Sequence, residues 1–332
     1  MKRIGISIIL CLLLSVSCSD LIVEPNKSNE NVEDFNVAWQ TINEVYPYFE
    51  FKNIDWDAIY PVYKTKAENA RGDEIFSVLM ELIFELKDAH MGLKTNGSVV
   101  PIYYKSPRAI RDQDAYSPYV VRRYFNQELE LSANKNINFG QITADIGYIR
   151  IGSFEKDTYE IYDVISSFLN TQGLIIDVRQ NSGGSSDFAD ELISHFIDQN
   201  KISPLSYKRN TPAYSYTIRP KNPYYSKPVV VLANGNTFSS AEGFCKIMED
   251  ISTVTIIGDT TAGGCGNPQW YSLPSGTKIR VSTTCFLKYD GQPVEWNGIY
   301  PDIRVVQIKA DIDSGRDKQL EYAINYLNTI TQ

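Results

Sequence analysis

Apolar side chains recur at helical spacing between residues 33 and 92. One stripe runs through 34–48, a second through 55–70 and a third through 73–86, each with its apolar residues on a single helical face. Asp55 is a favourable N-cap for the second of these helices. The pattern therefore predicts an N-terminal cap of three helices over residues 33–92.

The pattern changes beyond residue 146, where short apolar runs alternate with amphipathic segments. Strands and helices of this length in alternation imply a parallel sheet with right-handed crossovers, so we predict an α/β core over residues 146–332. The predicted strands are 146–151, 174–178, 229–232 and 254–257, with a β-ribbon over 278–285. The predicted helices are 158–169, 187–197, the segment that follows Ser239, and 316–327.

Residues 93–145 lie between these two regions and carry no clear period. Extended fragments are expected at 99–104 and 118–125, among proline, asparagine and charged residues. We expect a β-rich or irregular connecting segment, to which the residues themselves assign no function.

Composition excludes several classes of function. The chain has 332 residues, of which 43% are hydrophobic and 22% charged, as expected of a globular protein. A net charge of -8 and a pI near 5.0 argue against nucleic acid and against charge-driven binding to an anionic membrane. Two histidines, unpaired cysteine motifs and the lack of a Walker or G-x-G-x-x-G loop argue against zinc and nucleotides. We expect no metal and no cofactor.

The first 18 residues are typical of an export leader. Lys2 and Arg3 precede a short apolar run, residues 4–14, which ends in small residues before Cys18. The arrangement resembles a bacterial lipoprotein leader with lipidation at Cys18; a plain secretory peptide is the alternative. We expect export and a lipid anchor at the bacterial cell envelope as the only membrane attachment. Polar residues 19–32 are expected to form a flexible tether.

Residues 229–242, V-V-V-L-A-N-G-N-T-F-S-S-A-E, predict a buried strand, a tight turn and the start of a helix. Ser239 would stand at the carboxyl end of the sheet and the amino end of that helix. Free backbone N–H groups and the positive end of the helix dipole lie at such a position. These features suit a nucleophile in acyl transfer. An ordinary helix N-cap is the alternative interpretation of this serine.

A second loop could meet this serine. Gly183 and Gly184 follow the predicted strand 174–178, and ligands in parallel sheets bind at the carboxyl ends of the strands. A backbone without Cβ atoms can approach a ligand closely and direct its N–H groups inward. Together with the amide of Ser240, this turn could form an oxyanion hole. A flexible surface turn is the alternative.

Only two histidines could serve as a base for Ser239. His90 would lie just past the third helix of the cap, whereas His195 falls inside a predicted helix, where a histidine more often packs or is solvated. His90 is therefore the candidate, and the ordinary imidazole pKa of about 6.5 predicts a rate that rises with pH through that value. Cys265, which lies in a glycine loop, is an alternative candidate for the nucleophile.

Six segments, taken in order, resemble the tail-specific, or C-terminal processing, serine protease family. They are L-K-D-A-H, G-Y-I-R-I-G-S-F, G-L-I-I-D-V-R-Q-N-S-G-G, N-T-F-S-S-A-E-G-F, G-D-T-T-A-G-G and E-W-N-G-I-Y-P-D-I. The resemblance covers His90 and most of residues 146–306. It implies a crotonase-like (ClpP/crotonase) β/α spiral core and endopeptidase activity, and the short 93–145 segment leaves no room for the PDZ domain common in the family.

The resemblance also assigns roles. It places the nucleophile on Ser239 and the oxyanion donors on Ser240 and the Gly183–Gly184 turn. One branch of the family uses a Ser–Lys dyad, but its lysine position is Gly264 here. The sequence instead resembles the tricorn-core branch, which uses a histidine, here His90, and a glutamate that matches Glu295. Two other acidic residues could orient the imidazole instead, namely Asp88 and Glu242.

Two hypotheses follow. The first is a serine-type endopeptidase that hydrolyses polypeptides or peptides through Ser239, His90 and Glu295. The second is a peptide-binding module that keeps the fold without turnover. It is motivated by the missing lysine and by Ala89, which stands where the tricorn-core branch has a serine before its histidine.

Overall fold

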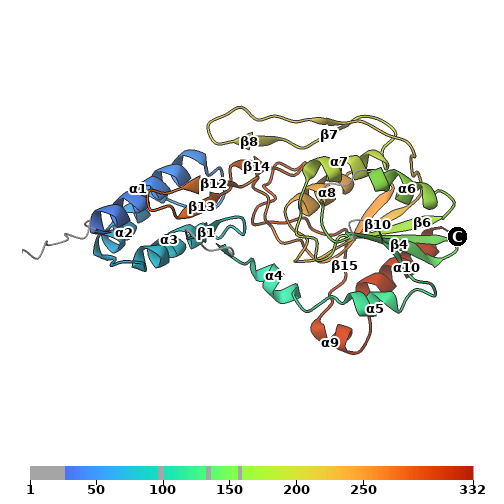
Figure 1. The fold of residues 1–332 in the computed structure, drawn as a ribbon. Coiled ribbons are helices and arrows are strands. Elements are labelled where there is room, and N and C mark those ends of the chain that lie inside the picture. Colours follow the sequence, from blue (N-terminus) through green and yellow to red (C-terminus); the bar gives the residue numbers. More distant parts are fainter. Residues whose placement is uncertain (1–26, 96–100, 132–135, 156–158, 332) are drawn as a thin grey trace, which may run out of the picture.

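Three helices form one end of an elongated molecule (Figure 1). The computed structural model describes residues 27–95, 101–131, 136–155 and 159–331. The helices are α1 (Lys27–Val45), α2 (Trp56–Asn69) and α3 (Glu74–Phe84), and the side chain of Asp55 caps α2 by accepting from the N–H of Ala58. Within the described ranges, no helix is long and apolar enough to cross a membrane. The expected leader and Cys18 lie outside these ranges.

The tether predicted for residues 19–32 overlaps α1. The helix already begins at Lys27, because its first turns are tied to the neighbouring helix. The side-chain amide of Asn31 donates to the carbonyl of Ala70 over 3.0 Å, and Phe35 lies fully buried one turn later. The sequence pattern alone gives polar residues 27–32 no reason to be helical, since their partner is distant in the chain.

The three helices pack on a four-stranded antiparallel sheet with the order β12-β13-β1-β2. Its strands are β1 (Gly92–Lys94), β2 (Ile102–Tyr103), β12 (Gln269–Ser272) and β13 (Lys278–Val281). Leu93, Ile279 and Val281 share one buried cluster with side chains from all three helices. Residues 269–281, which we placed in the α/β core, therefore complete the N-terminal end of the molecule instead.

The other end is a seven-stranded sheet with the order β15-β11-β10-β6-β5-β4-β3. Its strands are β3 (Glu130–Leu131), β4 (Ile137–Thr143), β5 (Ile146–Ile151), β6 (Gly173–Asp177), β10 (Val229–Ala233), β11 (Val254–Gly258) and β15 (Ile303–Arg304). The strands from β15 to β5 are parallel, as predicted, whereas β4 and β3 pair antiparallel.

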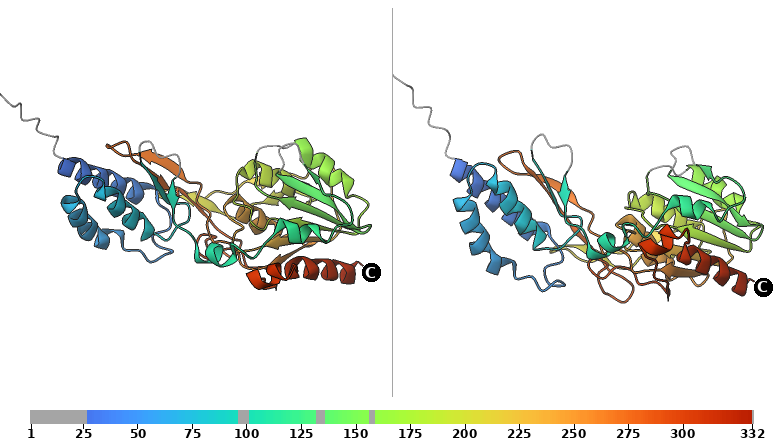
Figure 2. Two further views of the ribbon diagram at one scale, coloured as in Figure 1. Left: turned by 60° about the horizontal axis from the view of Figure 1, so that its bottom comes forward. Right: turned by 90° about the horizontal axis from the view of Figure 1, so that it is seen from below.

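Helices cover both faces of this sheet (Figure 2). One face packs against α6 (Tyr159–Ser167), α7 (Ser186–Ser194) and α8 (Ser240–Met248), and the other against α5 (Pro118–Arg122) and α10 (Lys318–Ile330). In the β6–β10 register, Asp177 lies opposite Leu232. The loops that leave β6 and β10 therefore start side by side at the same edge. This architecture is an α/β fold, and the crotonase-like spiral stays a prediction.

Two extended segments predicted from the sequence differ in the structure. Residues 118–125 contain the short helix α5, because Pro118 follows Ser117 in the first helical turn, where a missing N–H costs nothing. The ribbon predicted for residues 278–285 divides into β13 and β14 (Thr284–Phe286), which pair with different strands. The alternating pattern predicted extended structure correctly, but it could not identify the strands with which β13 and β14 pair.

A long excursion connects α7 to β10. It contains β7 (Lys201–Ile202), β8 (Ser206–Lys208) and β9 (Thr217–Ile218). Figure 1 shows it running from the α/β end toward the N-terminal helices, and β8 pairs with β14 on the way. The last elements are the short, exposed α9 (Lys309–Asp313) and α10.

Candidate active site

Ser239 lies in a strained turn between β10 and α8. Its backbone angles are φ 59° and ψ -123°, a conformation that non-glycine residues rarely adopt. The N–H of Ser239 donates to the carbonyl of Gly264 over 3.0 Å, which holds the turn in this shape. Glu242, three residues later, accepts from the N–H of Ser239 over 3.2 Å, as in a capping box. The hydroxyl of Ser239 lies at the amino end of α8.

His90 contacts this hydroxyl directly. Its Nε2 lies 3.0 Å from the Oγ of Ser239, although the two residues are 149 positions apart. The ring stacks on Phe238 at a centroid distance of 4.4 Å, and the backbone N–H of His90 donates to Asp88 Oδ1 over 2.7 Å. These contacts fix both the ring plane and the turn that carries it. His90 and Ser239 line one cavity of about 800 Å³.

The environment of His90 favours the neutral imidazole. Burial lowers the pKa of His90 to about 4, and the nearby charge of Asp88 opposes this only in part. The imidazole is therefore unprotonated at neutral pH and can accept a proton from the serine. The sequence-based expectation of a titration near pH 6.5 was wrong, because it ignored the cost of burying an imidazolium.

The Gly183–Gly184 turn lies against Ser239. A Cβ on Gly183 would stand 2.6 Å from the Cβ of Ser239, and the hydroxyl of Ser240 donates to the carbonyl of Gly184 over 2.7 Å. The N–H of Gly183 already donates to Asn181 Oδ1 over 2.8 Å. Gly183 was one of the expected oxyanion donors, but its N–H is already used. Its lack of a Cβ instead lets the turn pack closely against Ser239.

The other two expected donors remain free. Within the described ranges, the N–H groups of Gly184 and Ser240 have no hydrogen-bond acceptor, and both residues line the same cavity as Ser239. The structure therefore brings Ser239, His90, Gly184 and Ser240 together, as the position of the two loops at the sheet edge implied.

Glu242 is fully buried but does not orient His90. Its carboxylate accepts from the hydroxyl of Thr261 at 2.5 Å, from the N–H groups of Gly263 and Gly264 at 2.7 Å each, and from the N–H of Ser239 at 3.2 Å. Burial raises the pKa of Glu242 to about 6, and these hydrogen bonds limit the rise. The residue ties the 261–264 loop to the turn of Ser239, so the suggestion that it orients the imidazole was wrong.

Asp88 and Glu295 lie beside the imidazole of His90. One polar atom from each of the three side chains lies within 4.8 Å of the others. Asp88 Oδ2, His90 Nδ1 and Glu295 Oε2 are buried and have no hydrogen-bond partner among the described residues. Both acids therefore remain candidates to stabilise the imidazolium, and neither is hydrogen-bonded to the ring in this structure.

Lys52 distinguishes the two acids. Its ammonium lies 2.6 Å from Glu295 Oε1 and also donates to the carbonyl of Leu86 over 2.8 Å. Burial, and after it the charge of Asp88, raises the pKa of the Glu295 carboxyl well above its usual value, and Lys52 opposes this rise only in part. Three potential metal ligands meet here, but a fixed ammonium on one of them disfavours a further cation. The set suits a transient imidazolium better than a metal ion.

Helix α4 (Pro107–Asp112) fastens the loops of the site, a role the sequence gave no sign of. The guanidinium of Arg108 donates to the carbonyls of Thr261 and Ala262, each at 3.3 Å, and to that of Trp296 at 3.0 Å. These carbonyls belong to the loop bound by Glu242 and to the residue after Glu295.

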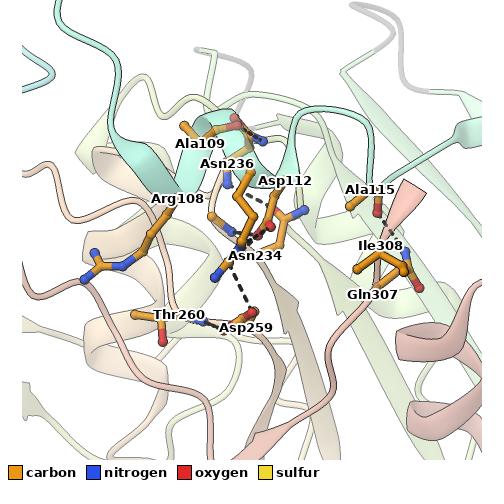
Figure 3. Close-up of polar contacts among 12 residues, drawn as sticks. Arg108, Ala109, Asp112, Ala115, Asn234, Asn236, Asp259, Thr260, Gln307 and Ile308 are labelled. Atoms are coloured by element: carbon orange, nitrogen blue, oxygen red, sulfur yellow. Dashed lines mark hydrogen bonds and ion pairs between the residues drawn. The ribbon is translucent and has the colours of Figure 1, made fainter. Parts of the chain in front are cut away.

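The same helix holds the turn that follows β10 (Figure 3). The N–H of Gly235 donates to Asp112 Oδ2 over 2.7 Å, and the side-chain amide of Asn236 donates to the carbonyl of Ala109 over 3.1 Å. The 93–145 segment, to which we assigned no function, thus braces the turn that presents Ser239. Lys52 and Arg108 carry no sequence signal, because their partners are set only by the tertiary fold.

The remaining candidates are His195 as a base and Cys265 as a nucleophile. His195 ends α7, and its Nδ1 contacts the carbonyl of Pro223 at 2.8 Å, away from Ser239. Cys265 lines the cavity, but burial raises the pKa of its thiol well above the usual value. A buried, protonated thiol is a poor nucleophile, so the geometry favours Ser239.

Comparisons with known proteins identify relatives for both ends of the chain. Residues 145–305 match Peptidase family S41, and residues 28–84 match the Tricorn protease C1 domain. The carboxy-terminal processing protease CtpA of Bacillus subtilis is 30% identical over 164 residues, which are 48% of this chain and 35% of the relative. CtpB of the same organism is 28% identical over 260 residues, or 75% and 52% of the two chains.

A solved structure from Parabacteroides merdae covers more of the molecule. It is 27% identical, with a TM-score of 0.80, over 90% of this chain and 96% of the other. The chain spans about half or less of the two curated relatives. Together with the six sequence segments, these matches place residues 145–305 in Peptidase family S41 and relate residues 28–84 to the Tricorn protease C1 domain.

Proposed function

We propose that this protein is a serine-type endopeptidase that hydrolyses peptide bonds of exported proteins or peptides. The observation that carries the proposal is the 3.0 Å contact between His90 Nε2 and Ser239 Oγ inside a cavity of about 800 Å³. A buried neutral imidazole at this distance can remove the serine proton as the hydroxyl attacks a carbonyl carbon. Family membership supports the same reaction.

The oxyanion that forms in this attack needs donors close to the nucleophile. The amides of Gly184 and Ser240 supply two N–H groups that no protein acceptor in the described part of the chain competes for. Such preorganised donors act without reorganisation, and the loss of one typically lowers kcat by roughly 10²- to 10³-fold. Collapse of the intermediate releases the amine, which takes its proton from His90, and water then hydrolyses the acyl-enzyme.

The imidazolium needs a negative charge at the same moment. We assign this role to Glu295, which clusters with His90 and whose Oε2 is buried without a hydrogen bond among the described residues. A small movement of the ring or the carboxylate would complete a Ser–His–Glu arrangement. Support comes from the match of residues 28–84 to the Tricorn protease C1 domain and from Gly264, which leaves no lysine at the dyad position. Asp88 is the alternative partner.

Ser239→Ala tests the proposal. A fluorophosphonate probe should label the unmodified protein, and mass spectrometry should place the adduct on Ser239. The variant should lose labelling and hydrolysis of an unfolded protein such as casein. Labelling of Ser240 instead would contradict the assignment. No labelling of the unmodified chain, combined with tight binding of peptides, would favour the alternative of a peptide-binding module.

We propose in addition that the protein is exported and held at the cell envelope by a lipid on Cys18. The leader of residues 1–18 motivates this proposal. Cys18→Ala should move the protein from the membrane fraction to the soluble fraction and abolish incorporation of labelled palmitate. Palmitate labelling that persists in this variant would refute the assignment.

A further inference from the structure

Lys246 lies on the floor of the active-site cavity, two helical turns beyond the nucleophile. Ser239, Gly243 and Lys246 fall on one face of α8, and all three line the cavity. Seven residues span about 10 Å along a helix, and helical side chains tilt back toward the amino end. A Cβ added to Gly243 would meet nothing within 4 Å. The space between the hydroxyl and the ammonium is therefore open.

No ion pair or hydrogen bond holds the ammonium of Lys246 in the part of the chain that the structure describes. Only 2% of the residue is exposed. Within the described ranges, its ammonium makes no hydrogen bond and has no carboxylate within 4.0 Å, and it lies 5.3 Å from the centroid of the Phe286 ring. Burial lowers the pKa of Lys246. A lysine charge with so little exposure and no paired anion is costly, so this position on the cavity wall favours an anionic ligand.

The other charged groups of the cavity do not meet this need. Asp190 on α7 acts on Lys246 through its charge, but its hydrogen bond is accepted from the hydroxyl of Tyr216 over 3.2 Å rather than from Lys246. Burial also raises the pKa of Asp190 to about 6, which weakens its hold on a neighbouring cation. Asp187 is exposed, and Arg280 packs its guanidinium on Tyr103 at 5.3 Å.

We infer that Lys246 is a specificity-determining residue that binds a carboxylate of the substrate next to the scissile bond. The inference rests on the proposed peptidase function and names its substrate class: chains with an acidic side chain, or a free carboxyl terminus, close to the cleaved peptide. Both sources present the same group to the ammonium. Such a charge pair in a desolvated site can discriminate strongly against an uncharged analogue.

Competition for the nucleophile tests this inference in the full-length protein. The readout is the rate at which a small fluorophosphonate labels Ser239 in the presence of hexapeptide libraries. Each library fixes Glu or Gln at one position, randomises the others and carries either a free or an amidated carboxyl terminus. We expect a carboxylate at one position to lower the protecting concentration roughly 10- to 100-fold. Preference for Glu identifies a side chain, and preference for the free terminus identifies a chain end.

Lys246→Met should remove that preference, and Lys246→Arg should retain most of it. Lys309→Met is the matched control, because it removes a lysine charge from exposed α9 and should leave the preference unchanged. Equal protection by Glu and Gln libraries at both kinds of terminus would overturn the inference, as would the same preference in Lys246→Met. A protein that labels without any preference contradicts only this inference, whereas a protein that never labels contradicts the proposed function on which it rests.

Discussion

Two buried carboxylate sites flank Ser239, and they differ in how their hydrogen bonds are filled. Glu242 accepts hydrogen bonds from three N–H groups and one hydroxyl, so both oxygens of its carboxylate have donors. On the other side, one oxygen of Asp88, one oxygen of Glu295 and the far nitrogen of His90 have no partner among the described residues. We call the first site saturated, because its carboxylate accepts several hydrogen bonds, and the second unsaturated, because buried polar atoms there have no partner among the described residues.

The difference separates a structural role from a chemical one. A buried carboxylate whose oxygens already accept hydrogen bonds from several backbone N–H groups fixes the backbone around the nucleophile. Unfilled acceptors beside an imidazole gain most when that ring becomes positively charged, which happens only during the reaction. Stability should therefore depend on Glu242, and rate on the cluster of Asp88, His90 and Glu295.

The largest effect should come from His90. His90→Gln keeps the side chain polar and of similar size but removes the base. We expect kcat/KM to fall by roughly 10⁴-fold or more, with the unfolding midpoint in urea nearly unchanged. His195→Gln is the matched control, since that ring does not contact Ser239, and its kcat/KM should stay within a few-fold of the unmodified protein. A His90→Gln variant with undiminished probe labelling would remove His90 from the mechanism.

Glu242→Leu should show the opposite profile. The substitution leaves four buried donors unpaired, so the free energy of unfolding should fall by roughly 3–5 kcal/mol. Urea denaturation at pH 7, followed by tryptophan fluorescence, measures this loss. Glu242→Gln keeps one acceptor oxygen and should lose less. If Glu242→Leu were as stable as the unmodified protein, the distinction between the two carboxylate sites would fail.

The pH dependence of stability should sharpen the comparison. His90 has a pKa of about 4 in the folded chain, against about 6.5 in the unfolded chain. Between these values the unfolded state binds the extra proton, so the free energy of unfolding falls as pH decreases. This contribution is fully present above pH 6.5, and about 3 kcal/mol is lost by pH 4.

Urea titrations of the unmodified protein and of His90→Gln between pH 4 and pH 7 isolate this contribution. The difference in the free energy of unfolding between the two proteins should change by about 3 kcal/mol from pH 7 to pH 4. Parallel curves would show that the imidazole of the folded protein titrates normally. The acid limb of kcat/KM should likewise lie near pH 4 in the unmodified protein, provided that the fold survives there.

The smallest effects should distinguish the two acids of the unsaturated cluster. Because each acid partly substitutes for the other, we expect Glu295→Gln to lower kcat/KM roughly 10- to 100-fold and Asp88→Asn to lower it less than tenfold. Steady-state kinetics on one peptide measures both. The reverse order would make Asp88 the residue that stabilises the imidazolium, with Glu295 serving mainly as the counter-charge of Lys52.

Local patterns predicted much of the fold and part of the site. The apolar run that became β10 and the Asp55 cap of α2 are decided by neighbours in sequence. The meeting of Gly184 with Ser239 followed from a general rule, because the carboxyl ends of parallel strands share one edge. Those inferences needed no knowledge of which side chains touch.

Other parts could not be predicted because distant residues decide them. Arg108 acts on carbonyls more than 150 positions away, and Lys52 acts on Glu295 across 243 positions. Nothing near either residue in the sequence marks it. The helical form of residues 27–32 and the depressed pKa of His90 likewise depend on burial, which a pattern of residues indicates only roughly.

The 149 positions between His90 and Ser239 have a consequence for biosynthesis. His90 comes from the turn between α3 and β1, and Ser239 comes from the turn before α8. Under the proposed mechanism, a nascent chain gains activity only after both segments have been made and have docked. The order of synthesis would then keep the chain latent until the two parts of the fold meet.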